Sequence, residues 1–207
     1  NNTLYTIAQF YPRMAVYSDY QGWQHKQFLG QGEFTLPFGD FTVSITVPSD
    51  HVVASTGSLQ NPSSVLSSSQ RKRYAEARRS FDQPVIVASQ EEAESREQGR
   101  STSTATWTFK AENVRDFAFA SSRKFIWDAQ AVNIGGKVVM AESFYPKEGN
   151  PLWEQYSTRI VAHSLKVYSK YTTNYTYPRA ISVHAKSIGM EYPMICFNGG
   201  RPDADGT

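Results

Sequence analysis

The chain has 207 residues, which is enough for one large domain or two modest ones. Aromatic residues make up 14% of the sequence and can bury large areas, so a chain disordered throughout is excluded. Lys and Arg number 21 against 19 Asp and Glu, and a net charge of +2 does not imply nucleic-acid binding. No stretch of 18 apolar residues is present, so no membrane span is expected, and the single cysteine excludes an internal disulfide.

The first half of the sequence has the pattern of β-strands. Residues 41–47 alternate apolar and hydroxyl side chains and end at a Pro-Ser-Asp turn, and a short strand is expected at 51–55. Residues 58–69 are polar and serine-rich, which predicts a loop. A basic segment at 71–79 and an acidic one at 91–97 predict two solvated helical pieces. Residues 58–100 are therefore interpreted as a charged insertion.

Strand patterns return after this insertion and then give way to a helix. Strands are expected within 101–119, 125–131 and 136–144, the last two joined by a hairpin turn at 133–136. Asn150 and Pro151 are typical of a helix start, and apolar residues three or four apart predict one helix of roughly 20 residues that ends near 171. A strand at 180–186 and an apolar segment at 188–197 follow. The best internal boundary lies near residues 112–114.

Motifs for nucleophilic, zinc or phosphate chemistry are absent from the sequence. There is no Gly-x-Ser-x-Gly, the four histidines are far apart, and no glycine-rich phosphate loop precedes a helix. Cys196 stands between Ile195 and Phe197, where the simplest interpretation is a small buried hydrophobe. Glu191 is more unusual, because it places a carboxylate in an apolar segment. By itself it is most simply a solvent-facing residue of an edge strand.

Three stretches together resemble one family. The segment Gly189-Met190-Glu191-Tyr192-Pro193-Met194 resembles the Gly-x-Met-Glu-Asn exopeptidase motif of zinc aminopeptidases related to aminopeptidase N, the gluzincins with a thermolysin-like catalytic domain. Ile188 stands where this motif has its first Gly, and Tyr192 where it has Asn. Residues 9–57, with Gly30-Gln31-Gly32-Glu33-Phe34 among them, are similar to the family's N-terminal β domain, and residues 113–119 to the entry of its catalytic domain.

This resemblance implies a β-rich α+β fold. Residues 1–112 would form the C-terminal part of an N-terminal β-sandwich or saddle domain, with the charged insertion at about 58–100. Residues 113–207 would form the sheet and first helix of the thermolysin-like catalytic domain. The family's His-Glu-x-x-His zinc helix is not found in the sequence. The resemblance therefore implies a fragment that is inactive alone, with no catalytic residue, metal ligand or cofactor of its own, and zinc in the full-length parent.

The same resemblance implies which residues would bind substrate. Glu191 would hold the free α-ammonium group of a peptide, Gly189 and Met190 would lie along the peptide, and Gln9 would supply a second contact to the amine. The implied partner is thus a peptide amino terminus, from which the parent would remove residues. Relatives with this pattern are often bacterial and exported, so a periplasmic or secreted bacterial protein is one option that the resemblance offers, while the sequence leaves the compartment undecided.

Two other functions stay open at this point. One is a stand-alone, non-catalytic β-rich module that binds peptides or proteins. The other is a nucleic-acid or anionic-lipid surface at residues 71–79, against which the nearby acidic run counts. In a fragment, the helix at 152–171 and the last strand would also lack neighbours, and the apolar surface so exposed could drive self-association.

Overall fold

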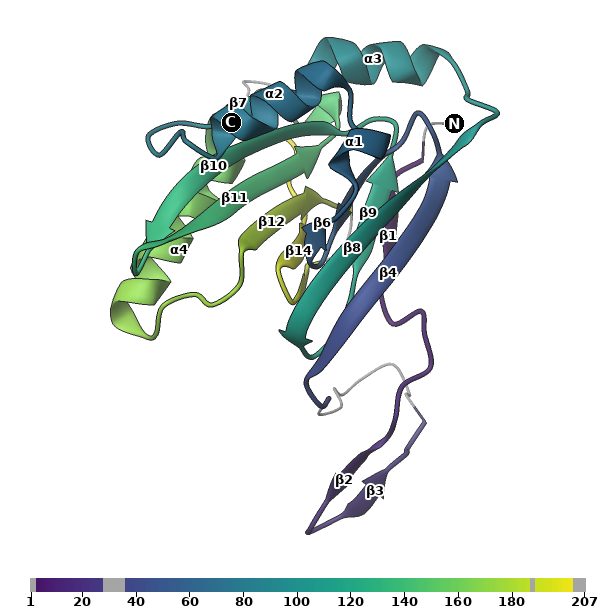
Figure 1. Ribbon diagram of the computed structural model, residues 1–207, viewed down its shortest axis with the longest axis vertical. Coiled ribbons are helices and arrows are strands. Elements are labelled where there is room, and N and C mark those ends of the chain that lie inside the picture. The colour runs from purple at the N-terminus through teal and green to yellow at the C-terminus, as the bar shows by residue number, and fades with distance from the viewer. Residues whose placement is uncertain (1–2, 28–35, 187–188, 203–207) are drawn as a thin grey trace.

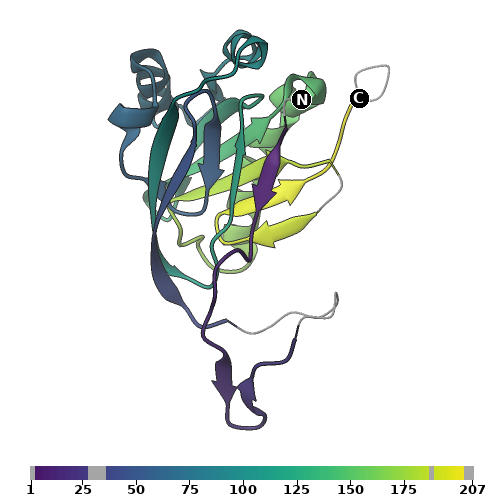
Figure 2. The ribbon, with the colours of Figure 1, turned by 90° about the vertical axis from the view of Figure 1, so that its right-hand side faces the viewer.

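The computed structural model describes residues 3–27, 36–186 and 189–202, and its fold is β-rich α+β, as the sequence predicts. Figure 1 shows one large sheet with a helix behind it and smaller sheets beside it. Figure 2, turned by a quarter, shows the smaller sheets facing the large one. One core cluster contains buried residues from both parts, so the large and small sheets share a hydrophobic interior.

The amino-terminal half forms two three-stranded sheets and a projecting hairpin. One sheet has the order β4 (Gly39–Pro48), β8 (Thr104–Val114) and β6 (Ser58–Leu59), and the other β1 (Tyr5–Ile7), β9 (Phe119–Ser122) and β5 (Val52–Ser55). Alternation along β4 places Ile45 in the core and Thr46 outside, 2.9 Å from the Thr106 hydroxyl. The hairpin of β2 (Val16–Ser18) and β3 (Gly22–Gln24) extends away from the sheets (Figure 1).

The large sheet is six-stranded and mixed. Its order is β13 (Met190–Tyr192), β14 (Ile195–Asn198), β12 (Arg179–His184), β11 (Lys137–Tyr145), β10 (Ile126–Ile134) and β7 (Val85–Ala88). β11, β12 and β14 run parallel, whereas β13, β10 and β7 pair antiparallel with their neighbours. Gly135 and Gly136 take positive φ values of 56° and 82°, which confirms the predicted hairpin turn.

The prediction for residues 58–69 is wrong. Instead of a loop, this stretch contains β6 and the short helix α1 (Pro62–Val65), and Leu66 is buried in the core. The predicted helices are confirmed as α2 (Ser68–Ala77) and α3 (Gln90–Gln98), each of which begins with a serine capping box. β7 lies between them and joins the large sheet, so this region is not simply a solvated insertion.

Strand pairing crosses the predicted boundary near residue 112 in both directions. β7, from the first half, pairs with β10, and β9, from the second half, pairs with β1 and β5. The described pairings therefore give no clean division there, and the domain limits stay a prediction.

The predicted long helix is present, with an irregular start. After the short 3-10 turn η1 (Lys147–Gly149), a π-helical turn η2 (Trp153–Ser157) leads directly into α4 (Thr158–Tyr171). α4 buries Ala162 and Leu165 against one face of β10 and β11. The predicted apolar stripe is wider than this buried face, because Ile160 is 60% exposed and Tyr168 is 69% exposed. No helix in the described ranges is long and apolar enough to cross a membrane.

The described part of the predicted apolar segment at 188–197 belongs to a hairpin of residues 190–198. β13 and β14 are joined by a turn at Pro193 and Met194, and Met194 has a left-handed φ of 66°. The sequence predicts the strand at 180–186, found as β12, and an edge strand around Glu191, found as β13, but gives no bounds for β13 and does not predict β14. Ile188 and the Gly30–Phe34 motif lie outside the described residues.

Candidate functional site

β13, which carries the sequence motif, is an outer strand of the large sheet. It pairs antiparallel with β14, with Met190 opposite Phe197 and Glu191 opposite Cys196. Side chains of directly paired residues lie on the same face, so Glu191 shares the face of Cys196 while Met190 points toward the core. The other edge of β13 pairs with no strand among the described residues.

The register places Glu191 at the end of a row of side chains that crosses the sheet. Ser143 on β11 is aligned with Ser182 on β12, Ser182 with Cys196 on β14, and Cys196 with Glu191. Burial raises the pKa of the Cys196 thiol, and the negative charge of the Glu191 carboxylate raises it further. The row therefore runs from beneath η2, where Ser143 lies 2.8 Å from the Ser157 hydroxyl, to an exposed carboxylate at the sheet edge.

Glu191 has an exposed side chain with no hydrogen bond or ion pair to any other described residue. Several other carboxylates are engaged, among them Glu142, which is paired with Arg179, and Glu92, which is paired with Arg73. A carboxylate without an internal partner at an open strand edge is able to accept hydrogen bonds from a cationic ligand.

The turn beside Glu191 is held by the amino-terminal half of the chain. The Thr56 hydroxyl donates to the Pro193 carbonyl at 2.9 Å and accepts from the Ala118 amide at 3.1 Å. The Ile181 amide donates to the Met194 carbonyl at 2.8 Å, and Met194 is buried. Residues of both halves of the chain therefore hold the turn that follows β13. Because the strand is already ordered, a ligand that binds it loses less free energy to ordering the protein.

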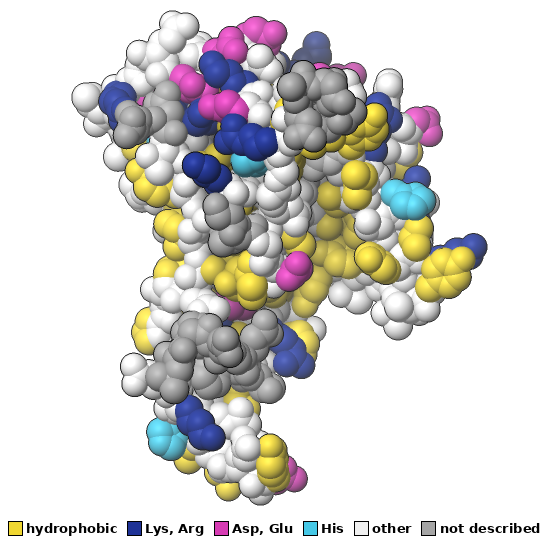
Figure 3. Space-filling model, turned by 180° about the vertical axis from the view of Figure 1, so that it is seen from behind, with side chains coloured by type: hydrophobic (Ala, Val, Ile, Leu, Met, Phe, Trp, Pro, Cys, Tyr) yellow, Lys and Arg dark blue, Asp and Glu magenta, His cyan; other side chains and the backbone are white. Residues whose placement is uncertain are grey.

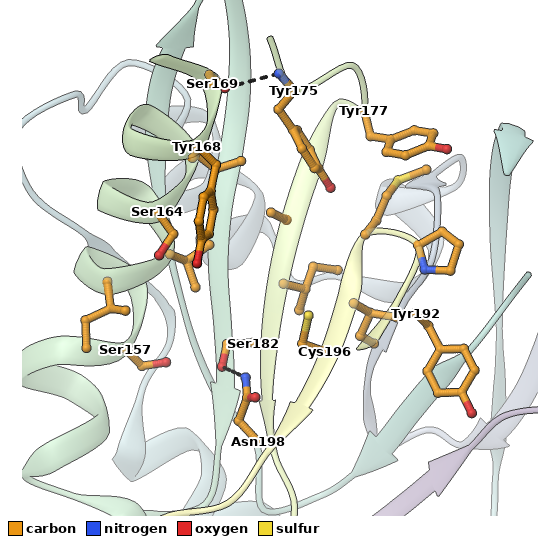
Figure 4. Close-up of a pocket in the computed structure, with 18 of the residues that line it drawn as sticks. Ser157, Ser164, Tyr168, Ser169, Tyr175, Tyr177, Ser182, Tyr192, Cys196 and Asn198 are labelled. Carbon is orange, nitrogen blue, oxygen red and sulfur yellow. Dashed lines mark hydrogen bonds between the residues drawn. The ribbon is translucent and has the colours of Figure 1, made fainter. Parts of the chain in front are cut away.

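A hollow of about 970 Å³ lies between α4, the loop that follows it, and strands β12 and β14. Figure 3 shows hydrophobic side chains gathered along this recess. Figure 4 shows Tyr168 on α4 facing Cys196 and Asn198 on β14 across it, with Asn198 donating to the Ser182 hydroxyl at 2.9 Å. None of the residues that line the hollow is charged, so it suits uncharged groups.

Gln9 is exposed and follows β1, with a left-handed φ of 52°. Its segment is anchored by Tyr11, whose hydroxyl donates to Asp116 at 2.8 Å, and by Arg13, which pairs with Asp116 at 3.0 Å. Burial and, after it, the hydrogen bond to Asp116 raise the pKa of Tyr11 to about 12. Tyr11 packs against the same core cluster as Met190.

The four predicted site residues are brought together only in part. Gly189, Met190 and Glu191 are neighbours in sequence, with Gly189 exposed just before β13. Gln9 follows β1, a strand of a separate sheet, and makes no hydrogen bond to Glu191. Sequence reasoning missed Thr56 and Asp116, whose contacts join segments more than 60 residues apart. It also missed the hollow, which forms only when the helix and loop at 152–177 pack against strands β12 and β14. Neither feature leaves a local sequence pattern.

The described residues do not fit a zinc site. No group of three His, Cys, Asp or Glu side chains within them could hold a metal ion. Of the buried histidines, His51 lies 2.8 Å from the Ser121 hydroxyl, and His184 packs edge-on against Trp153. The features that the described part offers to a ligand are the Glu191 carboxylate, the open edge of β13 and the uncharged hollow.

A second polar cluster connects the two halves beneath the large sheet. Arg179 donates to Glu142 at 2.5 Å and to the Gly57 carbonyl at 3.1 Å, and the Trp127 indole donates to Glu142 at 3.0 Å. Both charged side chains are buried. Because its members are enclosed and partnered internally, this cluster serves the fold.

No family model matches the sequence, and no match to a curated protein was found. Solved structures do resemble it. A two-domain M1 zinc metallopeptidase mutant bound to L-tryptophan has a TM-score of 0.50 and 15% identity, covering 77% of this chain and 30% of that one. A two-domain mutant bound to L-arginine has a TM-score of 0.48 and 14% identity, covering 79% and 31%. The M1 zinc metallopeptidase from Deinococcus radiodurans has a TM-score of 0.46 and 14% identity, covering 79% and 31%.

The chain therefore spans about a third of the length of these metallopeptidases. At 15% identity, the first of them shows a shared fold.

Proposed function

We propose that this chain is part of a zinc-dependent aminopeptidase, in which it binds the free amino terminus of a peptide substrate. The observation that carries the proposal is the exposed, unpartnered Glu191 carboxylate on the open edge strand of the large sheet. The fold shared with an M1 zinc metallopeptidase and the sequence motif around Glu191 support it. Because the described residues do not fit a metal, we assign hydrolysis to other parts of the parent protein.

Binding would use groups that β13 already presents. The α-ammonium group of the peptide would donate charge-assisted hydrogen bonds to Glu191. The free edge of β13 would pair with an extended peptide backbone, and Gly189 leaves open space where any other residue would place a Cβ. Gln9 is proposed as the second contact to the amine. A peptide with a blocked amino terminus has no ammonium group. It would cover the Glu191 carboxylate without donating a hydrogen bond to it, and should therefore bind less well.

The test compares free and blocked peptides. A tripeptide with a carboxy-terminal fluorophore and a free amino group should bind the chain about tenfold more tightly than its acetylated form, the lower end expected for a charged hydrogen bond. Fluorescence anisotropy measures both affinities. Glu191→Gln should remove the preference, whereas Glu76→Gln, on the exposed surface of α2, should preserve it. Equal affinities for both peptides would contradict the proposal.

Catalysis by the parent is tested on the full product of the gene. The proposal expects it to contain zinc and to release the first residue of free, but not acetylated, peptides. Glu191→Gln in that protein should weaken the discrimination between them. Peptide hydrolysis without preference for a free amino terminus would refute the assigned role of Glu191.

A peptide- or protein-binding module without catalysis is the second candidate, favoured by the open edge of β13 and the uncharged hollow beside it. This candidate expects the chain to bind acetylated and free peptides equally and to tolerate Glu191→Gln.

Self-association through the exposed apolar side of α4 is a further proposal, which sedimentation velocity at increasing protein concentration tests.

A further inference from the structure

α4 carries a row of basic side chains on its outer surface. Arg159, His163, Lys166 and Lys170 follow one another at intervals of four, three and four residues, so they lie along one side of the helix. All four are exposed, and no acidic residue lies between Thr158 and Tyr171. α4 lies behind β10 and β11 (Figure 1), and the side of the helix that packs on them carries Ala162 and Leu165, not the basic row.

The basic row has no internal counter-charge. None of the four side chains forms a hydrogen bond or ion pair with another described residue, and the Lys170 ammonium group lies over the Tyr171 ring, 5.2 Å from its centre. The basic segment singled out by the sequence, on α2, differs in this respect. There Arg73 is paired with Glu92 at 2.5 Å, and Arg71 donates to the backbone carbonyls of Ser63 and Leu66.

An exposed apolar row runs alongside the basic one. On α4, Ile160 is 60% exposed and Tyr171 75%, and their spacing of eleven residues places both on one exposed side of the helix. Tyr156 of the preceding turn η2 is 52% exposed. Tyr156 and Ile160 reach the rim of the hollow, whereas none of the four basic residues lines it. The outer surface of α4 is thus divided lengthwise into a basic row and an apolar row.

We propose that α4 binds an anionic lipid bilayer, lying flat on it with Ile160 and the tyrosines in the interface and the basic row at the headgroups. Helices that lie in a membrane interface combine these two features, and tyrosine is favoured at the level of the headgroups. With a rise of about 1.5 Å per residue, the 14-residue helix offers a contact about 21 Å long. Nucleic acid would use the cations but leave Ile160 exposed, so the apolar row favours the bilayer.

The test is co-sedimentation with vesicles of phosphatidylcholine alone or with 30% phosphatidylglycerol. The chain should bind the anionic vesicles and dissociate as salt is raised. Each cation near an anionic surface contributes about a fivefold gain in partitioning, so the triple variant Arg159→Gln, Lys166→Gln, Lys170→Gln should bind on the order of 100-fold more weakly. The matched control has the same charge change on exposed positions of α2 and its end: Lys72→Gln, Arg78→Gln, Arg79→Gln. It should bind like the unchanged protein.

A second variant separates a bilayer from other polyanions. Ile160→Gln with Tyr171→Ser keeps every charge and should weaken vesicle binding several-fold, while circular dichroism and urea unfolding verify the fold of each variant. Equal loss of binding in the α2 control would overturn the proposal, as would full binding by this apolar variant. Preferential binding to duplex DNA or polyglutamate, or a dimer that the apolar variant disrupts without any vesicle binding, would also overturn it.

Discussion

Asp128 on β10 is a buried carboxylate surrounded by hydroxyl groups. It accepts a hydrogen bond from Thr158 at 2.5 Å and from Tyr145 at 3.0 Å, and Ser143 lies 2.8 Å from the Thr158 hydroxyl. No described cation is paired with it. Burial raises the pKa of Asp128 from 3.8 to about 7, with the negative charge of Glu154 contributing in the same direction.

This shift predicts how stability changes with pH. The folded carboxyl group binds its proton more tightly than the unfolded one, so its contribution is complete below pH 3.8 and is lost as the pH rises through about 7. At 1.36 kcal/mol per pKa unit, the total is about 4 kcal/mol, of which about 2.5 kcal/mol is lost between pH 5 and pH 8. Ionised Asp128 therefore destabilises the folded protein at neutral pH.

Asp128→Asn removes the ionisation and keeps the shape of the side chain. Its amide can accept a hydrogen bond from one hydroxyl and donate to the other. The free energy of unfolding of the variant, minus that of the unchanged protein, should rise by about 2.5 kcal/mol from pH 5 to pH 8. Urea denaturation followed by tryptophan fluorescence measures both proteins at each pH.

The difference in free energy of unfolding between Asp128→Asn and the unchanged protein cancels the pH-dependent contributions of all other titrating groups that the two proteins share. Burial lowers the pKa of His51 and His184, so their contribution to stability decreases as the pH falls, opposite in direction to that of Asp128. A difference between the two proteins that stays constant from pH 5 to pH 8 would refute the assignment of a raised pKa to Asp128.

Three further predictions concern the packing between segments. Arg179→Met should destabilise the fold by about 3–5 kcal/mol, because Glu142 then stays buried without its cation; adding Glu142→Gln should recover part of this loss in urea denaturation. Ser89→Ala removes the cap of α3 and should cost about 1 kcal/mol, with no loss contradicting the capping role. Gly57→Ala would place a Cβ 2.5 Å from the Lys110 carbonyl at a φ of 87°, so its Tm should fall, whereas Gly99→Ala, which meets open space, should change little.

Local patterns in the sequence determined much of the secondary structure. Alternation at 41–47 predicted β4, two adjacent glycines predicted the turn between β10 and β11, and apolar spacing after Pro151 predicted the long helix. These predictions succeeded because strand and helix periodicities are set by neighbouring residues. The simplest interpretation of Glu191, a solvent-facing residue of an edge strand, agrees with its exposed position on β13.

Tertiary structure decided where these elements pack. The serine-rich composition of residues 58–69 predicted a loop, yet Leu66 is buried because it packs into the main core cluster. The charged composition on either side of β7 predicted solvated helices. β7 nevertheless joins the large sheet, because it can pair with the edge of β10. The fold also decides which charged side chains have a partner. It brings Glu92 to Arg73, but it brings no described opposite charge to Glu191 or to the basic row of α4. Periodicity is a property of consecutive residues, whereas pairing, burial and counter-charge arise between residues far apart in the chain.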